Sequence, residues 1–144
     1  MKILIADDDP VSRKIIERYI IEWGYDAITV SNGDEALGKL NESDCDINFA
    51  ILDWVMPGLS GLDVCRQIRS QKNRDFIYLM MLTAKNSEED FATGFDAGID
   101  DYIVKPFQKS ALFYRIQTAE RIIGLESELQ FLKRNIISEA TILT

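Results

Sequence analysis

The chain has 144 residues, which is enough for one domain of ordinary size and a short appendage. Its formal net charge of −8 argues against a nucleic-acid-binding surface, because such surfaces gather Lys and Arg. It contains no His, which excludes acid–base catalysis by His, a phosphohistidine and an imidazole metal site.

The cysteines and the hydropathy of the sequence indicate where in the cell the protein is expected. Cys45 and Cys65 lie far apart, without the spacing of a metal site or a disulfide framework, so we expect both to be reduced. The sequence opens on a strand pattern without a basic-then-apolar signal segment. No apolar stretch approaches the length of a membrane span. We therefore expect a cytoplasmic protein that binds neither membrane nor nucleic acid.

Short apolar runs alternate along the chain with segments of helical periodicity. Residues 3–6 form a continuous apolar run, typical of a strand covered on both faces. Asp9-Pro10 predicts a helix start, because Asp caps a helix and Pro suits its first position. Gly24 is expected to end that helix. A second strand is predicted at 27–30, near an edge of the sheet, and another helix follows it.

Each of the next three predicted strands is followed by polar residues of chemical interest. The runs and the residues after them are 47–52 with Asp53, 76–82 with Thr83-Ala84, and 100–104 with Lys105-Pro106. A capping-box pattern at Ser87 opens the helix after the fourth strand, and Phe91 and Phe95 are expected on its buried side. The last helix carries a core stripe of Leu112, Ile116, Ala119 and Ile123.

Five β/α alternations predict an α/β fold of the flavodoxin-like, doubly wound type, with a parallel sheet and helices on both faces. Ligands in such folds bind beyond the carboxyl ends of the strands, where the strand order reverses. The polar residues lie at these ends: Asp7, Asp8 and Asp9, Asp53, Thr83, and Lys105.

An acidic cluster is the main chemical signal. A helix N-terminus favours Asp for its dipole alone, and this simple interpretation accounts for Asp9. It explains Asp7, Asp8 and Asp53 less well, because these like charges would repel one another unless a cation joins them. Oxygen ligands without His or Cys favour Mg²⁺. Lys105 is expected to pair with Asp53, beside which the Thr83 hydroxyl could donate to a phosphoryl oxygen.

Four segments carry a resemblance to a known family: residues 3–9, 52–58, 81–84 and 97–107. On these motifs, residues 1–123 resemble the receiver domain of two-component response regulators. The resemblance implies a (βα)5 fold with a five-stranded parallel sheet of order 2-1-3-4-5. It also implies an output domain or partner that the receiver controls.

The resemblance further implies a role for each site residue. Asp53 would accept a phosphoryl group from the phosphohistidine of a sensor histidine kinase or phosphotransfer protein. Mg²⁺, with Mn²⁺ as a substitute, would be bound by Asp7, Asp8, Asp53 and the backbone carbonyl of Val55. Thr83, the backbone N–H of Ala84 and Lys105 would bind the phosphoryl group, and Thr83 and Tyr102 would act as the switch. Such a protein catalyses only its own phosphorylation and dephosphorylation and is not otherwise an enzyme.

Beyond the core stripe, an apolar seam continues in alternating steps of three and four residues: Ile122, Leu125, Leu129, Leu132, Ile136 and Leu143, with Glu139 interrupting. It predicts a homodimer through residues 122–138. Residues 124–144 resemble the signalling helix, a linker or coiled coil, that joins a receiver to an output domain outside this chain. A weaker likeness around Trp54 and residues 120–123 points to a cyclic-dinucleotide enzyme as that output. The alternative is a helix that folds back, with Gly124 as a hinge.

Other functions fit the sequence less well. A flavodoxin-like electron carrier needs a Ser/Thr/Gly loop after the first strand, where three aspartates would repel the FMN phosphate. A haloacid-dehalogenase-type phosphatase would use the spacing of Asp7 and Asp9, which leaves Asp53 unexplained. The remaining alternative is a phosphorylation-independent pseudo-receiver that acts as an interaction or dimerisation module.

Overall fold

The computed structural model describes residues 1–143, with side chains to residue 140; Thr144 and the side chain of Leu143 lie outside the described part. Strands and helices alternate in this part as β1 (Lys2–Ala6), α1 (Pro10–Glu22), β2 (Asp26–Val30), α2 (Gly33–Leu40), β3 (Phe49–Leu52), α3 (Gly61–Arg69), β4 (Tyr78–Thr83), α4 (Glu88–Asp96), β5 (Asp101–Val104) and α5 (Lys109–Leu143). The strands form one parallel sheet of order β2-β1-β3-β4-β5. Fold class and strand order are therefore confirmed.

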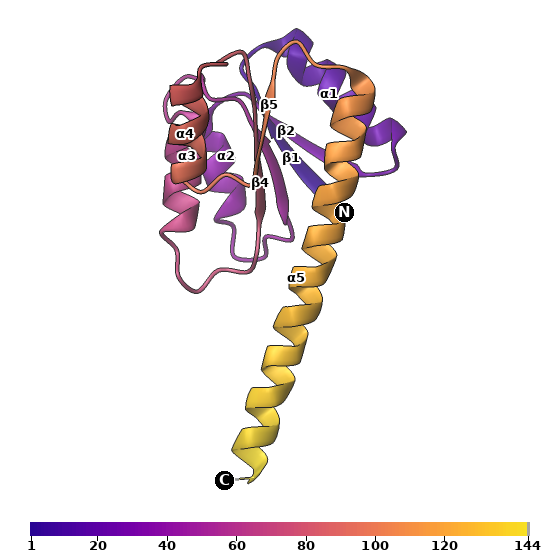
Figure 1. Ribbon diagram of the computed structural model, residues 1–144, viewed down its shortest axis with the longest axis vertical. Helices are drawn as coiled ribbons and strands as arrows, with labels where there is room; N and C mark the ends of the chain where they lie inside the picture. The colour runs from indigo at the N-terminus through magenta and orange to yellow at the C-terminus, as the bar shows by residue number, and fades with distance from the viewer. Residues whose placement is uncertain (144) are drawn as a thin grey trace.

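The sheet is covered on both faces (Figure 1). Along β1, Ile3 and Ile5 belong to the core shared with α1 and α5, whereas Leu4 and Ala6 belong to the core shared with α2 and α3. This alternation follows from the two-residue period of a strand. Every residue of β3 and β4 is buried, which explains why their sequences read as continuous apolar runs.

Local signals fix the helix ends. Asp9 caps α1, its carboxylate accepting a hydrogen bond from the N–H of Val11 at 3.1 Å. Ser60 and Ser87 form capping boxes that open α3 and α4. Gly24, just after α1, has a φ of 89°, a backbone conformation that suits Gly.

Some element details differ from the sequence prediction. The third strand begins at Phe49 rather than at residue 47, and the fourth begins at Tyr78 rather than at residue 76. The expectation for Phe95 was wrong, because this side chain is 49% exposed. Helix α4 is short and covers the sheet edge mainly through Gly94 and the partly buried Phe91, and Phe95 faces outward.

Helix α5 runs past the domain (Figure 1). The predicted core stripe from Leu112 to Ile123 is buried against the sheet, and Ile122 also packs partly against this core. Below it, the Gln130 amide donates to the Asp75 carboxylate at 2.8 Å, and Arg134 lies 3.5 Å from the same carboxylate. None of the helices in the described residues is long and apolar enough to span a membrane.

Arg69 at the end of α3 joins three segments that follow it in the chain. Its guanidinium donates to the carbonyl of Gly98 at 2.8 Å, to the carbonyl of Ile77 at 2.9 Å and to the Asp100 carboxylate at 2.7 Å. Burial raises the pKa of that carboxyl, and the Leu79 N–H and Arg69 oppose the increase. Arg69 thus links α3 to the backbone just before the N-terminal ends of β4 and β5.

We expect Arg69→Met to lower the free energy of unfolding by about 1–3 kcal/mol, because two carbonyls and a carboxylate lose their donor. Urea denaturation measures this change. Arg66→Met is the matched control, since Arg66 lies one turn earlier on the same helix and is exposed. Equal losses in both variants would show that the three contacts of Arg69 contribute nothing specific.

Candidate functional site

Two neighbouring strands present the acidic residues. Asp7 and Asp8 directly follow β1, and Asp53 directly follows β3. The Asp53 N–H donates to the Ala6 carbonyl at 2.9 Å, which extends the β1–β3 ladder by one step and fixes Asp53 beside Asp7. The Asp7 N–H donates to the Val30 carbonyl at 3.2 Å on the other side. The sheet itself therefore brings together residues that are 46 positions apart in sequence.

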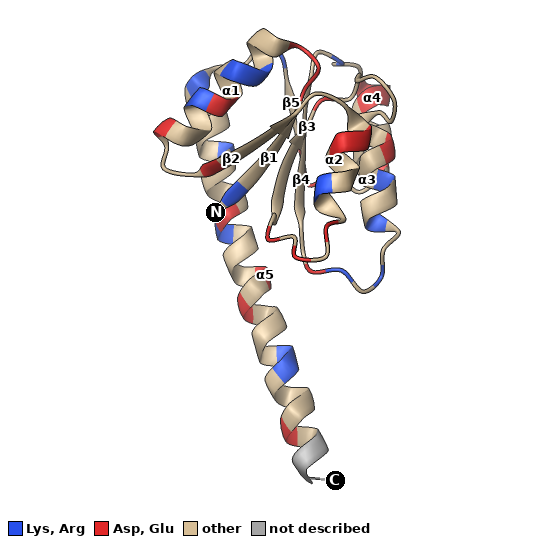
Figure 2. Ribbon diagram, turned by 180° about the vertical axis from the view of Figure 1, so that it is seen from behind, with Lys and Arg blue, Asp and Glu red and all other residues tan. Residues whose placement is uncertain are grey.

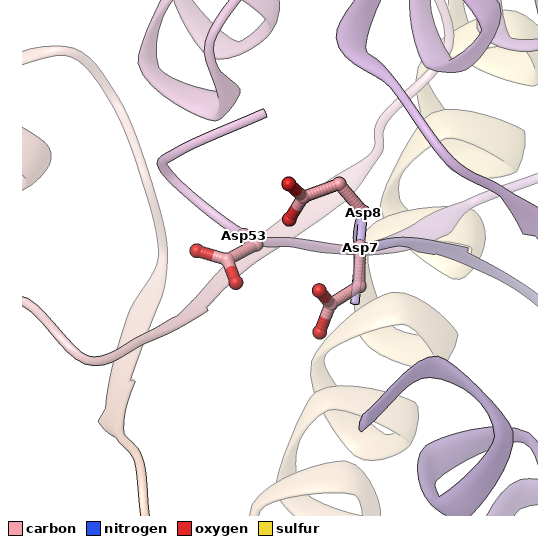
Figure 3. A group of neighbouring side chains, drawn as sticks. All are labelled: Asp7, Asp8 and Asp53. Atoms are coloured by element: carbon pink, nitrogen blue, oxygen red, sulfur yellow. The ribbon is translucent and has the colours of Figure 1, made fainter. Parts of the chain in front are cut away.

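The three carboxylates extend toward the same side of the strand ends (Figure 3). One oxygen from each of Asp7, Asp8 and Asp53 lies within 4.8 Å of the others, which is close enough for a shared cation. Asp7 is only 2% exposed, whereas Asp8 is open to solvent. The cluster is thus anchored in the protein on one side and accessible on the other.

Lys105 reaches the cluster from the end of β5. Its Nζ lies 2.6 Å from Asp7 Oδ2 and 2.9 Å from Asp53 Oδ2, and the side chain is 19% exposed. Burial by itself would lower the pKa of Lys105, but hydrogen bonds and charge interactions with Asp53 and Asp7 outweigh it and raise the pKa. The ammonium is therefore charged and bridges the two strand ends, as predicted for Asp53.

The charge of this arrangement suits a divalent cation. Three carboxylates and one ammonium leave two negative charges close together. A bound Mg²⁺ would neutralise them through the all-oxygen ligand set that this ion prefers. Val55, the predicted backbone ligand, stays near the cluster because its N–H donates to Asp53 Oδ1 at 3.3 Å. The donor set therefore fits Mg²⁺.

Thr83 and Tyr102 both contact the backbone of Lys85. Thr83 is buried at the end of β4, and its Oγ1 accepts a hydrogen bond from the Lys85 N–H at 3.5 Å. The Tyr102 hydroxyl donates to the Lys85 carbonyl at 2.8 Å. Burial, with a contribution from Asp90 and Asp53, raises the pKa of Tyr102 to about 12. The two predicted switch residues thus hold the same loop.

Lys85 also closes one side of the site. Its Nζ lies 5.1 Å from the centre of the Trp54 ring, within the range of a cation–π interaction. The contact joins the loop after β3 to the loop after β4. The sequence does not indicate this contact, because Trp54 and Lys85 are 31 positions apart and belong to no common motif.

A groove borders the site on the side of α1. It has a volume of about 540 Å³ and is lined mainly by apolar groups, among them Val11, Ile15, Ala84 and Phe107, together with Lys105 of the site. Val11 is 67% exposed and Ile15 is 42% exposed. Such exposed apolar residues beside a polar site favour contact with another protein. Helical periodicity alone does not predict a binding surface at Val11 and Ile15 of α1.

An acidic cluster, a strand-end lysine and a strand-end threonine at the reversal point of a doubly wound sheet define a phosphoryl-type site. Residues 3–117 match the response regulator receiver domain family. The chain therefore belongs to this family, the receiver domains of two-component response regulators, as its motifs predicted.

Individual relatives agree with this assignment. The transcriptional regulatory protein ResD of Bacillus subtilis is 42% identical over 120 residues, which are 83% of this chain and 48% of that protein. The chain thus spans about half the length of this curated relative.

Solved structures agree as well. The chemotaxis protein CheY4 of Vibrio cholerae is 29% identical, with a TM-score of 0.72 over 81% of this chain and 96% of that one. The receiver domain of the sensor histidine kinase PA1611 of Pseudomonas aeruginosa is 31% identical, with a TM-score of 0.72 over 85% of this chain and 97% of that one. That receiver has a magnesium ion coordinated in its active-site cleft.

We expect Asp8→Asn to weaken Mg²⁺ binding by roughly tenfold or more, because one charged ligand becomes neutral. The same change should raise the thermal stability of the metal-free protein, since it removes one of three mutually repelling charges. Titration of Trp54 fluorescence measures the affinity, in a Trp23→Phe background that leaves Trp54 as the single tryptophan.

Asp9→Asn is the control for this substitution, because Asp9 caps α1 and Asn caps equally well. It should leave Mg²⁺ affinity nearly unchanged. An Asp8→Asn variant that binds Mg²⁺ as tightly as the parent chain would remove Asp8 from the metal site.

Proposed function

We propose that this receiver accepts a phosphoryl group onto Asp53 from the phosphohistidine of a sensor histidine kinase or phosphotransfer protein, with Mg²⁺ bound by Asp7, Asp8, Asp53 and the Val55 carbonyl. The observation that carries the proposal is the position of Asp53, whose carboxylate meets both the Lys105 ammonium and the acidic cluster. A cytoplasmic location is part of the proposal. Beyond its own phosphorylation and dephosphorylation, the domain has no catalytic role in it.

The chemistry needs a positioned oxygen and compensation of charge. A carboxylate oxygen of Asp53 forms the new bond to phosphorus, while the bond from phosphorus to the donor's imidazole nitrogen breaks and its electron pair returns to that nitrogen. Bound Mg²⁺ would neutralise phosphoryl charge. Lys105 would offset the remaining charge on the phosphoryl oxygens, which it already does for the carboxylates. Thr83 and the Ala84 N–H would donate to the same oxygens.

The groove on the α1 side supports a protein donor rather than a small molecule alone. Lys105 lines the groove and contacts Asp53, so a partner helix placed in the groove would bring a phosphohistidine close to the acceptor. Val11 and Ile15 supply the exposed apolar surface that such a contact would bury. The magnesium-bound receiver of PA1611 supports the metal part of the proposal by analogy.

Thr83 and Tyr102 would pass the signal on. Movement of the Thr83 hydroxyl toward a phosphoryl group would break its contact with the Lys85 N–H and disturb the peptide to which Tyr102 donates. The face made by α4, β5 and α5 would change with it. A phosphorylation-independent pseudo-receiver finds no support, since the acids, Lys105 and Thr83 all stand at the site.

We expect Asp53→Asn to abolish phosphorylation by acetyl phosphate with Mg²⁺, because the amide is nearly isosteric but cannot form an acyl phosphate. Intact-mass measurement should show one labile phosphoryl group on the parent chain and none on the variant. The fold should persist, as far-ultraviolet circular dichroism can confirm. Asp9→Asn is the matched control and should be phosphorylated normally.

A base-labile phosphoryl group on the Asp53→Asn variant would show that another carboxylate is the acceptor. A parent chain that is never phosphorylated, although it binds Mg²⁺, would instead favour the pseudo-receiver.

The second part of the proposal concerns the tail. We propose that the receiver domain covers residues 1–123 and that residues 124–144 link it to an output domain. Among the α5 residues whose side chains the structure describes, Ile123 is the last buried one, and ResD is about twice as long as the stretch it shares with this chain. Transcriptional control is favoured by the name of that relative. A cyclic-dinucleotide enzyme, suggested by residues 120–123, is the other output.

The tail would also pair with a second copy through residues 122–138. We expect sedimentation equilibrium to show dimers of the intact chain that strengthen with concentration and a monomer for a chain truncated after Ile123. The dimer should be weak, because the seam has about two heptads. If the intact chain and the truncation both stay monomeric at high micromolar concentration, phosphorylated or not, this part of the proposal is wrong.

A further inference from the structure

The exposed part of α5 has two different faces. One face presents apolar side chains to solvent, with exposures that run from 45% for Leu129 to 65% for Ile136; its members are Leu125, Leu129, Leu132 and Ile136. They are separated by three or four residues, the spacing of heptad positions a and d. This set, together with Ile122, is the seam.

The other face of the tail is occupied by the chain's own domain. Gln130 and Arg134, which contact Asp75, lie seven and eleven residues beyond Ile123 and so continue its direction along the helix. At 3.6 residues per turn, the seam is rotated from that direction by roughly 140°. The domain therefore meets the tail on one side. Of the seam, Leu129 borders a groove that Arg74 and Phe76 of the domain also line, whereas Leu125, Leu132 and Ile136 are exposed. This geometry does not suit the alternative in which the tail folds back.

Four charged residues flank the seam. Acidic and basic residues are interspersed along the exposed part of α5 (Figure 2). With Ile122 and Leu129 at position a, Arg121 and Glu128 take position g, and Glu126 and Lys133 take position e. In parallel coiled coils, side chains at e and g pair between helices and set orientation.

We propose that the tail pairs with a second copy of this chain in a parallel, in-register coil, which Arg121 and Glu128 orient by meeting Glu126 and Lys133 of the second copy. The inference rests on the tail pairing proposed above and adds its direction and register. In this arrangement each g side chain faces the e side chain five residues later in the other helix. Both contacts join opposite charges, and the two-fold axis repeats them.

The four flanking charges cannot form ion pairs with neighbours on the same helix. The helix neighbours of a side chain lie three and four residues away. At those distances from Arg121, Glu126, Glu128 and Lys133 the sequence has no charged residue at all. Pairing across the seam is the interaction that their spacing supports.

A slipped parallel pair would be repelled. A shift by one heptad keeps three apolar layers, sets Leu132 against Glu139, and places Arg121 opposite Lys133 and Glu128 opposite Glu126. Both favourable contacts then become contacts between like charges. The charges therefore select one register among those that the apolar seam alone allows.

An antiparallel pair uses the charges less well. Matching Leu129 with Leu132 of the second copy keeps one attractive pair, Glu126 with Lys133, but leaves Glu128 opposite Asn135 and Arg121 without a charged partner. The same arrangement packs Glu139 against the Ile122 layer. In the parallel pair Glu139 falls after the last apolar layer, which limits the coil to the stretch that ends at Ile136.

Charge reversal tests the register. Lys133→Glu should raise the dimer dissociation constant of the whole chain roughly tenfold at low salt, because two attractive contacts become repulsive. Adding Glu128→Lys to that variant should restore most of the affinity. Arg134→Glu is the matched control, with the same change of charge on the adjacent residue, on the face that meets Asp75. It should leave the dissociation constant within about threefold of the parent.

Cross-linking tests the direction. Leu132→Cys in a Cys45→Ser background should form a disulfide-linked dimer on mild oxidation, because a parallel in-register pair places residue 132 beside its copy. The native Cys65 is buried and stays apart from the reaction.

The outcomes separate the two proposals. A chain that never dimerises overturns the pairing and the orientation together. A dimer that is insensitive to Lys133→Glu, that is not restored by Glu128→Lys, or that forms no disulfide through residue 132 overturns the orientation alone. Phosphorylation of Asp53 is measured separately and is unaffected by either result.

Discussion

The site depends on one partly buried ammonium group shared between two carboxylates. Lys105 Nζ contacts Asp7 and Asp53 at 2.6 and 2.9 Å, and these residues leave the sheet from β5, β1 and β3. Two carboxylates so close together would repel, and removal from water would make each charge costly on its own. The ammonium offsets both effects only because parallel strands end at the same edge. Electrostatics and topology are therefore inseparable here, since neither would hold the site without the other.

The same dependence explains which features the sequence predicts. Strands covered on both faces must be apolar throughout, so the runs before Asp7, Asp53 and Thr83 are visible without coordinates. Their polar successors then mark the edge where ligands bind in a doubly wound fold. Fold class and the cluster of Asp7, Asp8 and Asp53 follow from that reasoning, whereas the strand order came from the family resemblance. The chemical roles of these residues are a further step, which the geometry supports and phosphorylation experiments decide.

Other features could not be read from the sequence, because they involve backbone atoms or surfaces without periodicity. The link between Thr83 and Tyr102 passes through the backbone N–H and carbonyl of Lys85, which every residue except Pro would offer at that position. Arg69 likewise donates to two carbonyls that no residue type signals. The exposure of Phe95 escaped prediction for the opposite reason. Its helical spacing matched a buried face, but α4 is short and stands at the sheet edge.

A continuous set of contacts joins the site to the tail. Tyr102 follows Asp101 in β5, and the Asp101 carboxylate accepts a hydrogen bond from Arg115 of α5 at 2.7 Å. From Arg115 the helix continues without a break to the seam, so a rotation of α5 against β5 would reach every seam residue as one rigid movement.

A strong coiled coil would stay paired despite such a movement. A coil of about two heptads, oriented by a few exposed charge pairs, has a small free energy of association. A shift in the docking of α5 worth about 1.4 kcal/mol would therefore change the association constant of the pair about tenfold. The short and weakly held seam is thus the property that would let a single phosphoryl group at Asp53 control how two chains meet.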